Sequence, residues 1–343
     1  MHALPPPLTL GALRIDPPVL LAPMAGITDA PLRRQVARFG AGLTASEMIA
    51  GEELLQERPE AEGRAAISAD DPPTAAQIAG REPALMAEAA RIAEARGAAL
   101  IDINMGCPCK RVTNGLAGAG LLCDLDLALR VFEAVKEAVS LPVTVKTRLG
   151  WDEKTLTAPS LARRLEAAGV AMLTLHGRTR SQFYKGSADW AAVRETVEAV
   201  RIPVLVNGDI HDAAQARRAL ELSGAAGIMV GRAVQGAPWR LAEISAGLAG
   251  ADFAPPAPEA RLDLTLEQYD GMLGIYGIRI GVKAARKHLG WALAEAGEPG
   301  EALRRRLMST EEPAEVRKLL RAEFVAAFEA HAGGGRPEGR AAA

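Results

Sequence analysis

Eight short apolar runs, separated by longer stretches of mixed character, constrain the fold of this chain more than any other feature. Each run is only a few residues long and apolar nearly throughout, which is typical of a strand buried on both faces. The runs are Val19–Ala22, Ala41–Ser46, Thr74–Ile78, Ala99–Ile103, Val143–Val145, Met172–Leu175, Val204–Val206 and Gly227–Val230.

The stretches between the runs have helical periodicity. Apolar residues recur at spacings of three and four from Leu125 to Val139, after Asp124 in the position of an N-cap, and again from Trp190 to Val200. Asp212–Gln215 has the spacing of a capping box. Eight strand–helix units predict a (β/α)8 TIM barrel. A doubly wound open sheet is the alternative, but no Gly-x-Gly-x-x-Gly motif follows an early strand.

Only the first part of the chain has this alternation. We expect the barrel to span residues 1–248 and a linker rich in proline and alanine to span 249–260. Residues 261–330 show helical periodicity alone, which predicts a small all-α helical bundle. The last residues, 331–343, are rich in glycine and predict a disordered tail.

Composition excludes several classes of protein. A hydrophobic fraction of 49% and a charged fraction of 24% are typical of a globular chain, and a net charge of −2 excludes a globally basic nucleic-acid binder. Three clustered cysteines are too few for a secreted disulfide framework. No signal peptide and no membrane-spanning run is recognisable, so we expect a cytoplasmic protein.

Polar residues follow the predicted strands at their C-terminal ends, where TIM barrels carry their active sites. Amide, thiol, ammonium, imidazole and guanidinium groups would therefore meet at one mouth. The residues at these ends are Pro23, Met24, Glu47, Gln77, Asn104, Cys107, Lys146, Arg148, His176, Arg178, Asn207, Gly208, Asp209, Gly231 and Arg232.

The glycines after the last two predicted strands favour a phosphate site. Gly208 and Gly231 each precede a helical stretch, where backbone amides carry partial positive charge. The alternative is that both glycines only close tight turns. Lys146 ends a buried strand, where it would act either as a Schiff-base lysine or as a cation beside a bound ring. Gln77 has both a donor and an acceptor for the edge of a heterocycle. Together these groups favour a flavin mononucleotide site over a sugar-phosphate site.

Cys107 lies in a Gly-Cys-Pro turn before a glycine-rich loop. We interpret it as an active thiol, with a buried inert cysteine as the alternative. Cys107 and Cys109 do not form a CxxC pair, and no second cluster is present, so no metal site is expected.

Six ordered motifs resemble the tRNA-dihydrouridine synthases, most closely the bacterial DusB (nitrogen-regulation-like) subgroup. The resemblance extends from about Pro18 to Trp239, and more loosely through the helical part; Cys109 departs from the expected pattern. The motifs are Ala22–Asp29, Gln77–Gly80, Ile103–Pro108, Lys146–Trp151, His176–Arg180 and Asn207–Ile210.

The resemblance implies an FMN cofactor and specific roles for matching residues. Cys107 would be the general acid, and Asn104, Arg148 and Arg178 would lie near the target base or its phosphate. The implied FMN-binding residues are Ala22, Pro23, Met24, Gln77, Lys146, His176, Asn207, Gly208, Asp209, Gly231 and Arg232.

The resemblance also implies the reaction: reduction of the C5–C6 bond of a uridine in the D-loop of tRNA. Hydride would pass from flavin N5 to C6, and a proton from Cys107 to C5. NADPH or NADH would be the reductant, in a ping-pong cycle, and position 17 is the expected target. We expect a monomer, although the sequence leaves the oligomeric state open.

Basic residues in the predicted helical domain are the candidates for tRNA contacts. They fall at helical spacings, and the alternative is an ordinary solvated helix face. The central set is Arg279, Lys283, Arg286 and Lys287, with further clusters at residues 304–306 and 317–321. Three other functions remain open: a flavin barrel acting on a small molecule (dihydroorotate dehydrogenase or ene-reductase type), a Schiff-base aldolase, and a non-catalytic RNA-binding regulatory protein.

Overall fold

The computed structural model describes residues 4–51, 66–67, 71–113 and 116–333. The chain divides into two compact units. The first runs to Val234 and includes Trp239–Phe253, and the second consists of Gln235–Pro238 and the chain from Ala254 onward.

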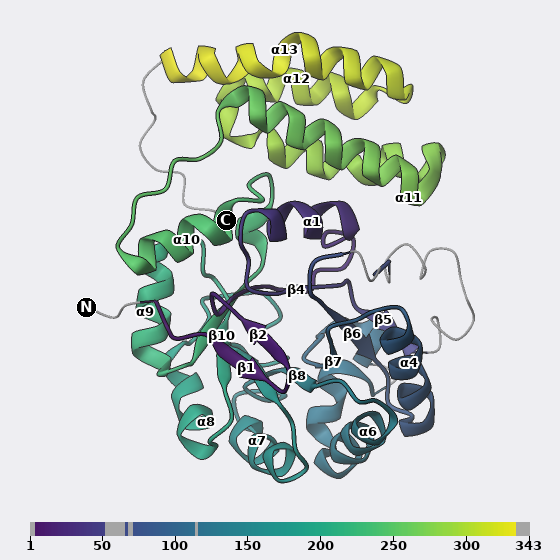
Figure 1. Cartoon of the computed structure of the whole chain (residues 1–343), viewed down its shortest axis with the longest axis vertical. Coiled ribbons are helices and arrows are strands. Elements are labelled where there is room, and N and C mark those ends of the chain that lie inside the picture. Colours follow the sequence, from purple (N-terminus) through teal and green to yellow (C-terminus); the bar gives the residue numbers. More distant parts are fainter. Residues whose placement is uncertain (1–3, 52–65, 68–70, 114–115, 334–343) are drawn as a thin grey trace. The chain divides into compact units, whose positions relative to one another are not determined.

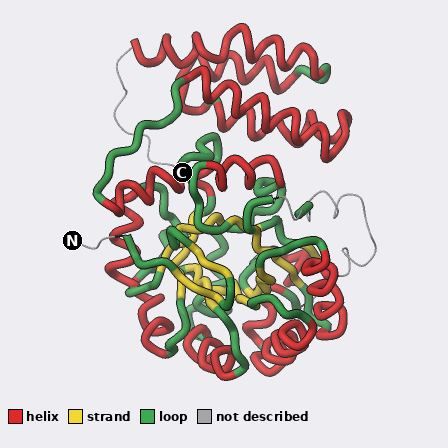
Figure 2. The backbone as a smooth tube through the Cα atoms, viewed as in Figure 1, coloured by secondary structure: helices red, strands yellow, loops and turns green. Residues whose placement is uncertain are grey.

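Eight parallel strands of the first unit form a barrel, which confirms the predicted fold class (Figures 1 and 2). Each predicted apolar run overlaps one strand of the ring, and several strands extend beyond the C-terminal end of their run. A parallel bridge between Leu20 and Leu43 closes the ring, with the Leu21 N–H donating to the Leu43 carbonyl at 3.0 Å. In spatial order the strands are β3 (Val19–Leu21), β11 (Gly227–Val230), β10 (Val204–Asn207), β9 (Met172–His176), β8 (Val143–Arg148), β7 (Leu100–Met105), β6 (Thr74–Ala79) and β4 (Thr44–Ala45).

Helices cover the outside of the ring and begin where the sequence supplies caps. Asp124 accepts from the Leu127 N–H at 2.9 Å, and Asp212 accepts from the Gln215 N–H at 2.7 Å. The Gln215 side chain binds the N–H of His211 and not that of Asp212, so the capping box is imperfect. The helices are α1 (Ala30–Arg38), α4 (Pro83–Ala95), α5 (Lys110–Thr113), α6 (Leu125–Ala138), α7 (Ala158–Ala167), α8 (Arg194–Ala199), α9 (Ala213–Ser223) and α10 (Arg240–Ala249), with 3-10 turns η1 (Gly118–Cys123), η2 (Ala191–Val193) and η3 (Arg232–Val234).

The barrel unit has two apolar cores. The larger lies between strands and helices and includes Val145 and Phe132. The smaller fills the barrel, and the hairpin of β1 (Leu8–Leu10) and β2 (Leu13–Ile15) contributes to it. This hairpin and the two-residue β5 (Ile49–Ala50) were not predicted. Because the hairpin packs with residues from the starts of the strands, it closes the N-terminal end of the barrel.

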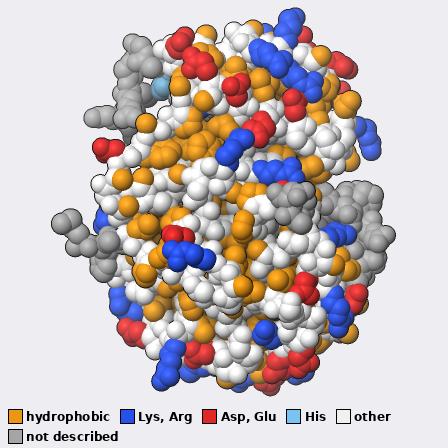
Figure 3. All heavy atoms as spheres, viewed as in Figure 1, with side chains coloured by type: hydrophobic (Ala, Val, Ile, Leu, Met, Phe, Trp, Pro, Cys, Tyr) orange, Lys and Arg blue, Asp and Glu red, His pale blue; other side chains and the backbone are white. Residues whose placement is uncertain are grey.

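The outer surface of the barrel has mixed charge. On the face shown in Figure 3, Lys and Arg side chains lie among Asp and Glu side chains over the helix-covered part of the barrel. Arg164 and Asp126 on the barrel helices form an exposed ion pair of this kind, at 2.6 Å. No helix in the described residues is both long and apolar enough to cross a bilayer.

The second unit is all-helical, with a core that includes Leu266, Tyr269 and Phe324. The first helix begins at Pro258, inside the predicted linker, because proline fits the first turn of a helix. This helix is interrupted at Gly277, where φ is +70°. The last helix continues to Gly333, beyond the predicted boundary at 330, and residues 334–343 of the predicted tail lie outside the described residues. The elements are α11 (Pro258–Ala292), η4 (Ala294–Ala296), α12 (Gly297–Ser309) and α13 (Pro313–Gly333).

Candidate active site

The structure brings the predicted site residues of the barrel together at the C-terminal ends of its strands. The register aligns Asn104 with Lys146 on neighbouring strands. It also aligns Arg148, His176 and Asn207 across β8, β9 and β10. Because side chains two apart on a strand share a face, these residues form two adjacent layers on the inner side of the barrel.

Lys146 is the fixed cation of the site. Its ammonium donates to Asn207 Oδ1 at 3.0 Å, and Asn207 is held in turn by donating to the Met229 carbonyl at 2.8 Å. Burial, and secondarily the charge of Arg148, lowers the pKa of Lys146 to about 8. Among the described residues no carboxylate lies within ion-pair distance of this ammonium. Lys146 therefore keeps donors for a further acceptor.

His176 is a neutral imidazole of defined tautomer. Burial, and secondarily the charge of Lys146, lowers its pKa well below the ordinary value for histidine. Its Nε2 lies 3.2 Å from Nη1 of Arg178. A guanidinium can only donate, so Nε2 accepts and the proton resides on Nδ1. Nδ1 has no partner among the described residues, so it offers an N–H to the barrel mouth.

The two arginines expected near the base are buried and bound by protein groups. Arg178 is 2% exposed and forms an ion pair of 2.5 Å with Asp209. Arg148 is also 2% exposed, and it donates to the Gly106 carbonyl at 2.7 Å and the Phe183 carbonyl at 2.8 Å. Both side chains thus brace the loops of the mouth, and their contact with a substrate stays a prediction.

Asp209 holds two cations. Besides Arg178, it accepts from Arg232 at 3.1 Å and from the Ala188 N–H at 2.8 Å. These donors lower the pKa of Asp209 despite partial burial, which by itself would raise it. The Arg232 side chain remains 51% exposed. Asp209 therefore positions Arg232, whose guanidinium can reach an anion.

The two predicted phosphate-site glycines differ in what requires them. Gly208 has a φ of +115°, and a Cβ there would lie 2.8 Å from the His176 ring. This glycine is needed for the backbone conformation and for packing against the imidazole. At Gly231 a Cβ would lie 3.4 Å from the Met24 sulfur, an ordinary contact distance. Only at Gly208 do sterics exclude a side chain.

The turn after β3 is fixed by the protein. The Met24 N–H donates to Thr28 Oγ1 at 3.0 Å, and the Gly26 N–H donates to the buried Glu47 carboxylate at 2.5 Å. Ala22 is buried and its N–H donates to the Val230 carbonyl at 2.8 Å. Ala22, Pro23 and Met24 thus lie on a rigid segment at the mouth.

Cys107 is held by the end of β7. Its N–H donates to Asn104 Oδ1 at 2.8 Å, and its carbonyl accepts from the Ala119 N–H at 3.1 Å. Gly118 packs behind it, since a Cβ there would lie 3.2 Å from the Cys107 Cβ. Burial raises the pKa of the Cys107 thiol. Cys107 is therefore a protonated thiol on a fixed loop.

Gln77 and Asn104 belong to a buried hydrogen-bonded row whose last member, Asp102, was not predicted. Asn104 Nδ2 donates to Gln77 Oε1 at 2.9 Å, and Gln77 Nε2 donates to Asp102 at 2.7 Å. A signal for Asp102 did exist, because a carboxylate two residues before Asn104 in an otherwise apolar strand must face the same side. The described residues contain no group of three His, Cys, Asp or Glu placed to hold a metal ion.

The predicted basic residues of the helical unit fall into two groups. Arg279, Lys283 and Lys287 are exposed on α11 and have no ion-pair partner among the described residues. Arg286 lies 4.0 Å from Glu311. In the additional clusters four cations are paired with acids, whereas Arg305 and Arg321 are exposed and have no ion-pair partner among the described residues. The pairs are Arg304–Glu301 (3.2 Å), Arg306–Glu323 (2.5 Å), Arg317–Asp270 (2.8 Å) and Lys318–Glu315 (3.5 Å). Arg279, Lys283 and Lys287 therefore form a row of exposed positive charges on α11 that an anionic partner could contact.

Comparison with known proteins identifies the family. Residues 20–330 match the family described as dihydrouridine synthase (Dus). The chain belongs to the dihydrouridine synthase family. The resemblance drawn from its six motifs is thereby confirmed, and so is the prediction that the chain is an enzyme of this kind.

Individual members of the dihydrouridine synthase family match over most of their length. A Rhodobacter capsulatus protein described as a probable tRNA-dihydrouridine synthase is 55% identical over 320 residues, which cover 92% of this chain and 98% of that protein. The tRNA-dihydrouridine synthase B of Xanthomonas axonopodis pv. citri is 44% identical over 283 residues, covering 82% and 85%.

A solved structure supports the barrel fold of this family member. The crystal structure of TcOYE with pHBA superimposes with a TM-score of 0.52 at 13% identity, covering 78% of this chain and 98% of that one. At this identity the likeness concerns the fold alone.

Proposed function

We propose that this chain is an FMN-dependent tRNA-dihydrouridine synthase that reduces the C5–C6 double bond of a D-loop uridine. The observation that carries the proposal is a protonated thiol, Cys107, on a fixed loop at the same end of the barrel as the cation Lys146 and the neutral His176. Family membership and the relatives named as tRNA-dihydrouridine synthases support the assignment.

The chemistry of the donor set fits a flavin. Lys146 is half-buried, its ammonium makes a single hydrogen bond among the described residues, and burial together with the charge of Arg148 lowers its pKa. An anionic reduced ring would stabilise the charged ammonium and be stabilised by it. Gln77 and His176 each keep a further N–H for a polar ring edge.

The residues that would hold FMN fall into two groups. One lines the ring, and the other takes the ribityl chain and phosphate, with Asp209 acting through Arg232. In that order they are Ala22, Pro23, Met24, Gln77, Lys146 and His176, then Asn207, Gly208, Asp209, Gly231 and Arg232. When bound, the flavin supplies the hydride, which NADPH or NADH replenishes.

Cys107 would supply the proton. Saturating the C5–C6 bond of uracil requires hydride at C6 and a proton at C5, and the enolate-like charge between these steps needs a nearby acid. Because burial raises the Cys107 pKa, the group stays a thiol at neutral pH and is ready to donate. The fixed loop keeps this donor in place, and Asn104 lies beside it with one amide N–H remaining for the base.

One feature favours tRNA over a small molecule. Arg279, Lys283 and Lys287 form an exposed row of cations without ion-pair partners among the described residues, whereas most cations of the other basic clusters are paired with acids. A flavin barrel acting on a small molecule has no use for such a row. Phosphate contacts of this kind make binding depend steeply on salt. The target base must also leave its stack to reach the barrel mouth; position 17 is the proposed target.

The decisive experiment separates proton donation from flavin reduction. Cys107→Ala should be reduced by NADPH at the wild-type rate, seen as bleaching of flavin absorbance, yet form almost no dihydrouridine in tRNA by mass analysis. Cys123→Ala, at an exposed cysteine, is the matched control and should behave as wild type. Normal dihydrouridine formation by Cys107→Ala would refute the role of the thiol. Purified wild-type protein without flavin would refute the cofactor.

A further inference from the structure

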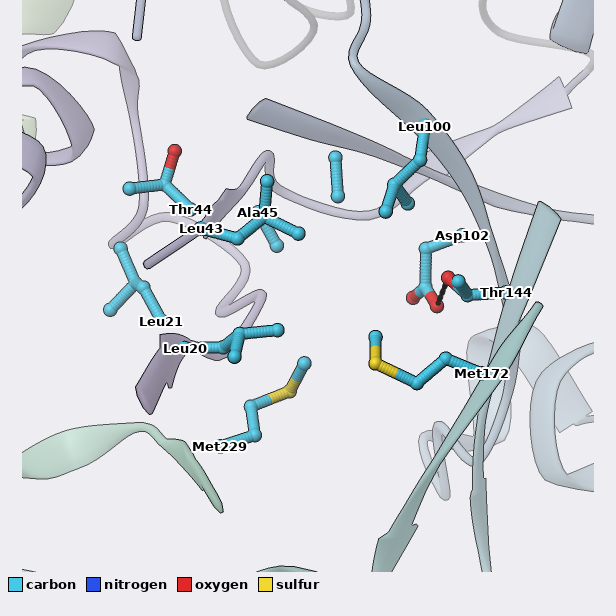
Figure 4. Close-up of a pocket in the computed structure, with 11 residues that line it drawn as sticks. Leu20, Leu21, Leu43, Thr44, Ala45, Leu100, Asp102, Thr144, Met172 and Met229 are labelled. Carbon is cyan, nitrogen blue, oxygen red and sulfur yellow. Dashed lines mark hydrogen bonds between the residues drawn. The ribbon is translucent and has the colours of Figure 1, made fainter. Parts of the chain in front are cut away.

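Asp102 is a buried carboxylate that none of the steps above uses. It lies in the middle of β7, is 5% exposed, and has no cation within ion-pair distance among the described residues. Figure 4 shows it inside the barrel, bonded to Thr144 and facing a small cavity with apolar walls that include Leu100 and Met172. Burying a carboxylate in such surroundings is costly, and the Asp102 pKa is raised by burial. An apolar residue would fill the space at lower cost.

The hydrogen bonds of Asp102 lead to the proton donor. Asp102 accepts from Gln77 Nε2 at 2.7 Å, and Gln77 Oε1 accepts from Asn104 Nδ2 at 2.9 Å. Asn104 Oδ1 accepts from the N–H groups of Gly106 at 3.1 Å and Cys107 at 2.8 Å. Asp102 also accepts from the Thr144 hydroxyl at 2.7 Å. One continuous series of hydrogen bonds thus joins Asp102 in the barrel interior to the Cys107 loop.

The donor-to-acceptor direction of these hydrogen bonds is fixed at the end where the backbone N–H groups of Gly106 and Cys107 bind Asn104. Peptide N–H groups can only donate, so the oxygen of Asn104 must face Gly106 and Cys107. The NH2 group of Asn104 then faces Gln77, which must present its oxygen there and its own NH2 group to residue 102. The series can end only on an acceptor. A carboxylate meets this need, and a donor or an apolar side chain at 102 would leave a buried N–H unsatisfied.

We propose that Asp102 is a positioning residue that sets the amide orientations of Gln77 and Asn104 and, through them, holds the Cys107 loop. This orientation leaves one N–H of each amide for ligands and keeps the thiol in place. The part of the proposal that concerns ligands rests on the proposed function. The part that concerns the Cys107 loop does not, because it is measurable in cofactor-free protein.

The test compares three single variants in two assays. Asp102→Leu replaces the carboxylate that accepts from Gln77 by an apolar side chain of similar size. Asp102→Asn keeps an acceptor oxygen for Gln77 and gives its NH2 group to the Thr144 hydroxyl. Thr144→Val removes the hydrogen bond from the Thr144 hydroxyl to Asp102, which is not part of the series that leads to Cys107. The first assay follows alkylation of Cys107 by iodoacetamide in cofactor-free protein, by peptide mass spectrometry, with the exposed Cys123 as internal reference. The second measures FMN affinity by quenching of flavin fluorescence.

Orientation by Asp102 predicts a specific pattern. Asp102→Leu should alkylate Cys107 about tenfold faster and bind FMN about tenfold more weakly, whereas Asp102→Asn and Thr144→Val stay within about threefold of wild type. Cys123 should react equally in all four proteins. Folded Asp102→Leu with wild-type alkylation would overturn the proposal. Equal damage in Asp102→Asn would also overturn it, because charge and not acceptor capacity would then matter.

Exchanging the amide and the carboxylate between residues 77 and 102 keeps the proposal testable if Asp102→Leu does not fold. Gln77→Glu places two carboxylates face to face, so the loop should loosen and Cys107 alkylation should rise about tenfold. Adding Asp102→Asn supplies a donor to Glu at 77, while Asn104 still donates to its other oxygen, and the rate should return to within about threefold of wild type. If the double variant did not restore the slow alkylation rate, the proposed hydrogen-bond series from Asp102 to the Cys107 loop would be refuted. If wild-type protein lacks flavin, the proposed function fails while the alkylation results still decide the role of Asp102.

Discussion

Replacing Lys146 by methionine should abolish uridine reduction and yet stabilise the cofactor-free protein. The barrel lowers the Lys146 pKa from 10.5 to about 8, chiefly by burial. At about 1.36 kcal/mol per pKa unit, the folded state loses roughly 3 kcal/mol by keeping this ammonium charged at pH 7. Losing the hydrogen bond to Asn207 costs about 1 kcal/mol. The net expectation for Lys146→Met is a gain of about 2 kcal/mol in the free energy of unfolding.

The dependence of this gain on pH identifies its cause. Because the folded-state pKa lies below the unfolded value, the folded protein binds its proton less tightly than the unfolded chain does. The destabilisation is therefore complete below pH 8, decreases as the pH rises from about 8 to 10.5, and vanishes above that range. The variant has no such term, so its advantage over wild type should be largely gone at pH 10.

Thermal unfolding of cofactor-free protein at pH 7 and pH 10 measures both quantities. A gain of about 2 kcal/mol corresponds to roughly 4–8 °C for a domain of this size. Lys154→Met, at an exposed lysine, is the control and should change stability by no more than about 0.5 kcal/mol at either pH. A Lys146 variant no more stable than wild type at pH 7, or equally favoured at both pH values, would refute the desolvation argument.

Three further predictions follow from the same contacts. The single-turnover rate of uridine reduction should fall at alkaline pH, where Lys146 loses its proton; because an anionic ring raises the Lys146 pKa above its value of about 8 in the cofactor-free protein, the fall should be centred above pH 8, and a flat profile from pH 7 to 10.5 would contradict this role. Arg148→Met should lower the free energy of unfolding by about 2–4 kcal/mol, because three loop carbonyls lose a buried donor, and urea titration would detect it. Lys283→Ala should reduce the salt slope of tRNA binding by about 0.7–0.9, whereas Arg306→Ala, at an ion-paired arginine, should leave it unchanged. Equal slopes for both variants would argue against the unpaired row.

The barrel strands and most of the site were predictable because each depends on local sequence. A strand covered by helices on one side and by a barrel interior on the other is apolar throughout, as in Val204–Val206. Residues that directly follow such a strand must lie at the mouth, which placed Lys146 and His176 correctly at one end. The N-terminal hairpin also had a signal in its alternation from Leu8 to Ile15, with Gly11 (φ +61°) at the turn.

What escaped prediction depends on partners distant in sequence. Whether a basic residue is available to RNA depends on which acid faces it, and Arg306 meets Glu323 only because α12 and α13 pack together. The role of Asp102 required the register of β6, β7 and β8, which aligns it with Gln77 and Thr144. Periodicity also continues across Gly277, so the break in α11 left no mark on the pattern.

The hairpin of β1 and β2 has a practical consequence. Because it plugs the starts of the strands, the barrel opens at one end only, and the chain enters the fold at the end opposite to Cys107 and Lys146. An affinity tag or surface tether fused ahead of the hairpin is therefore separated from the proposed active site by the full height of the barrel. Immobilising the enzyme through that terminus should leave the entrance clear for a molecule as large as a folded RNA.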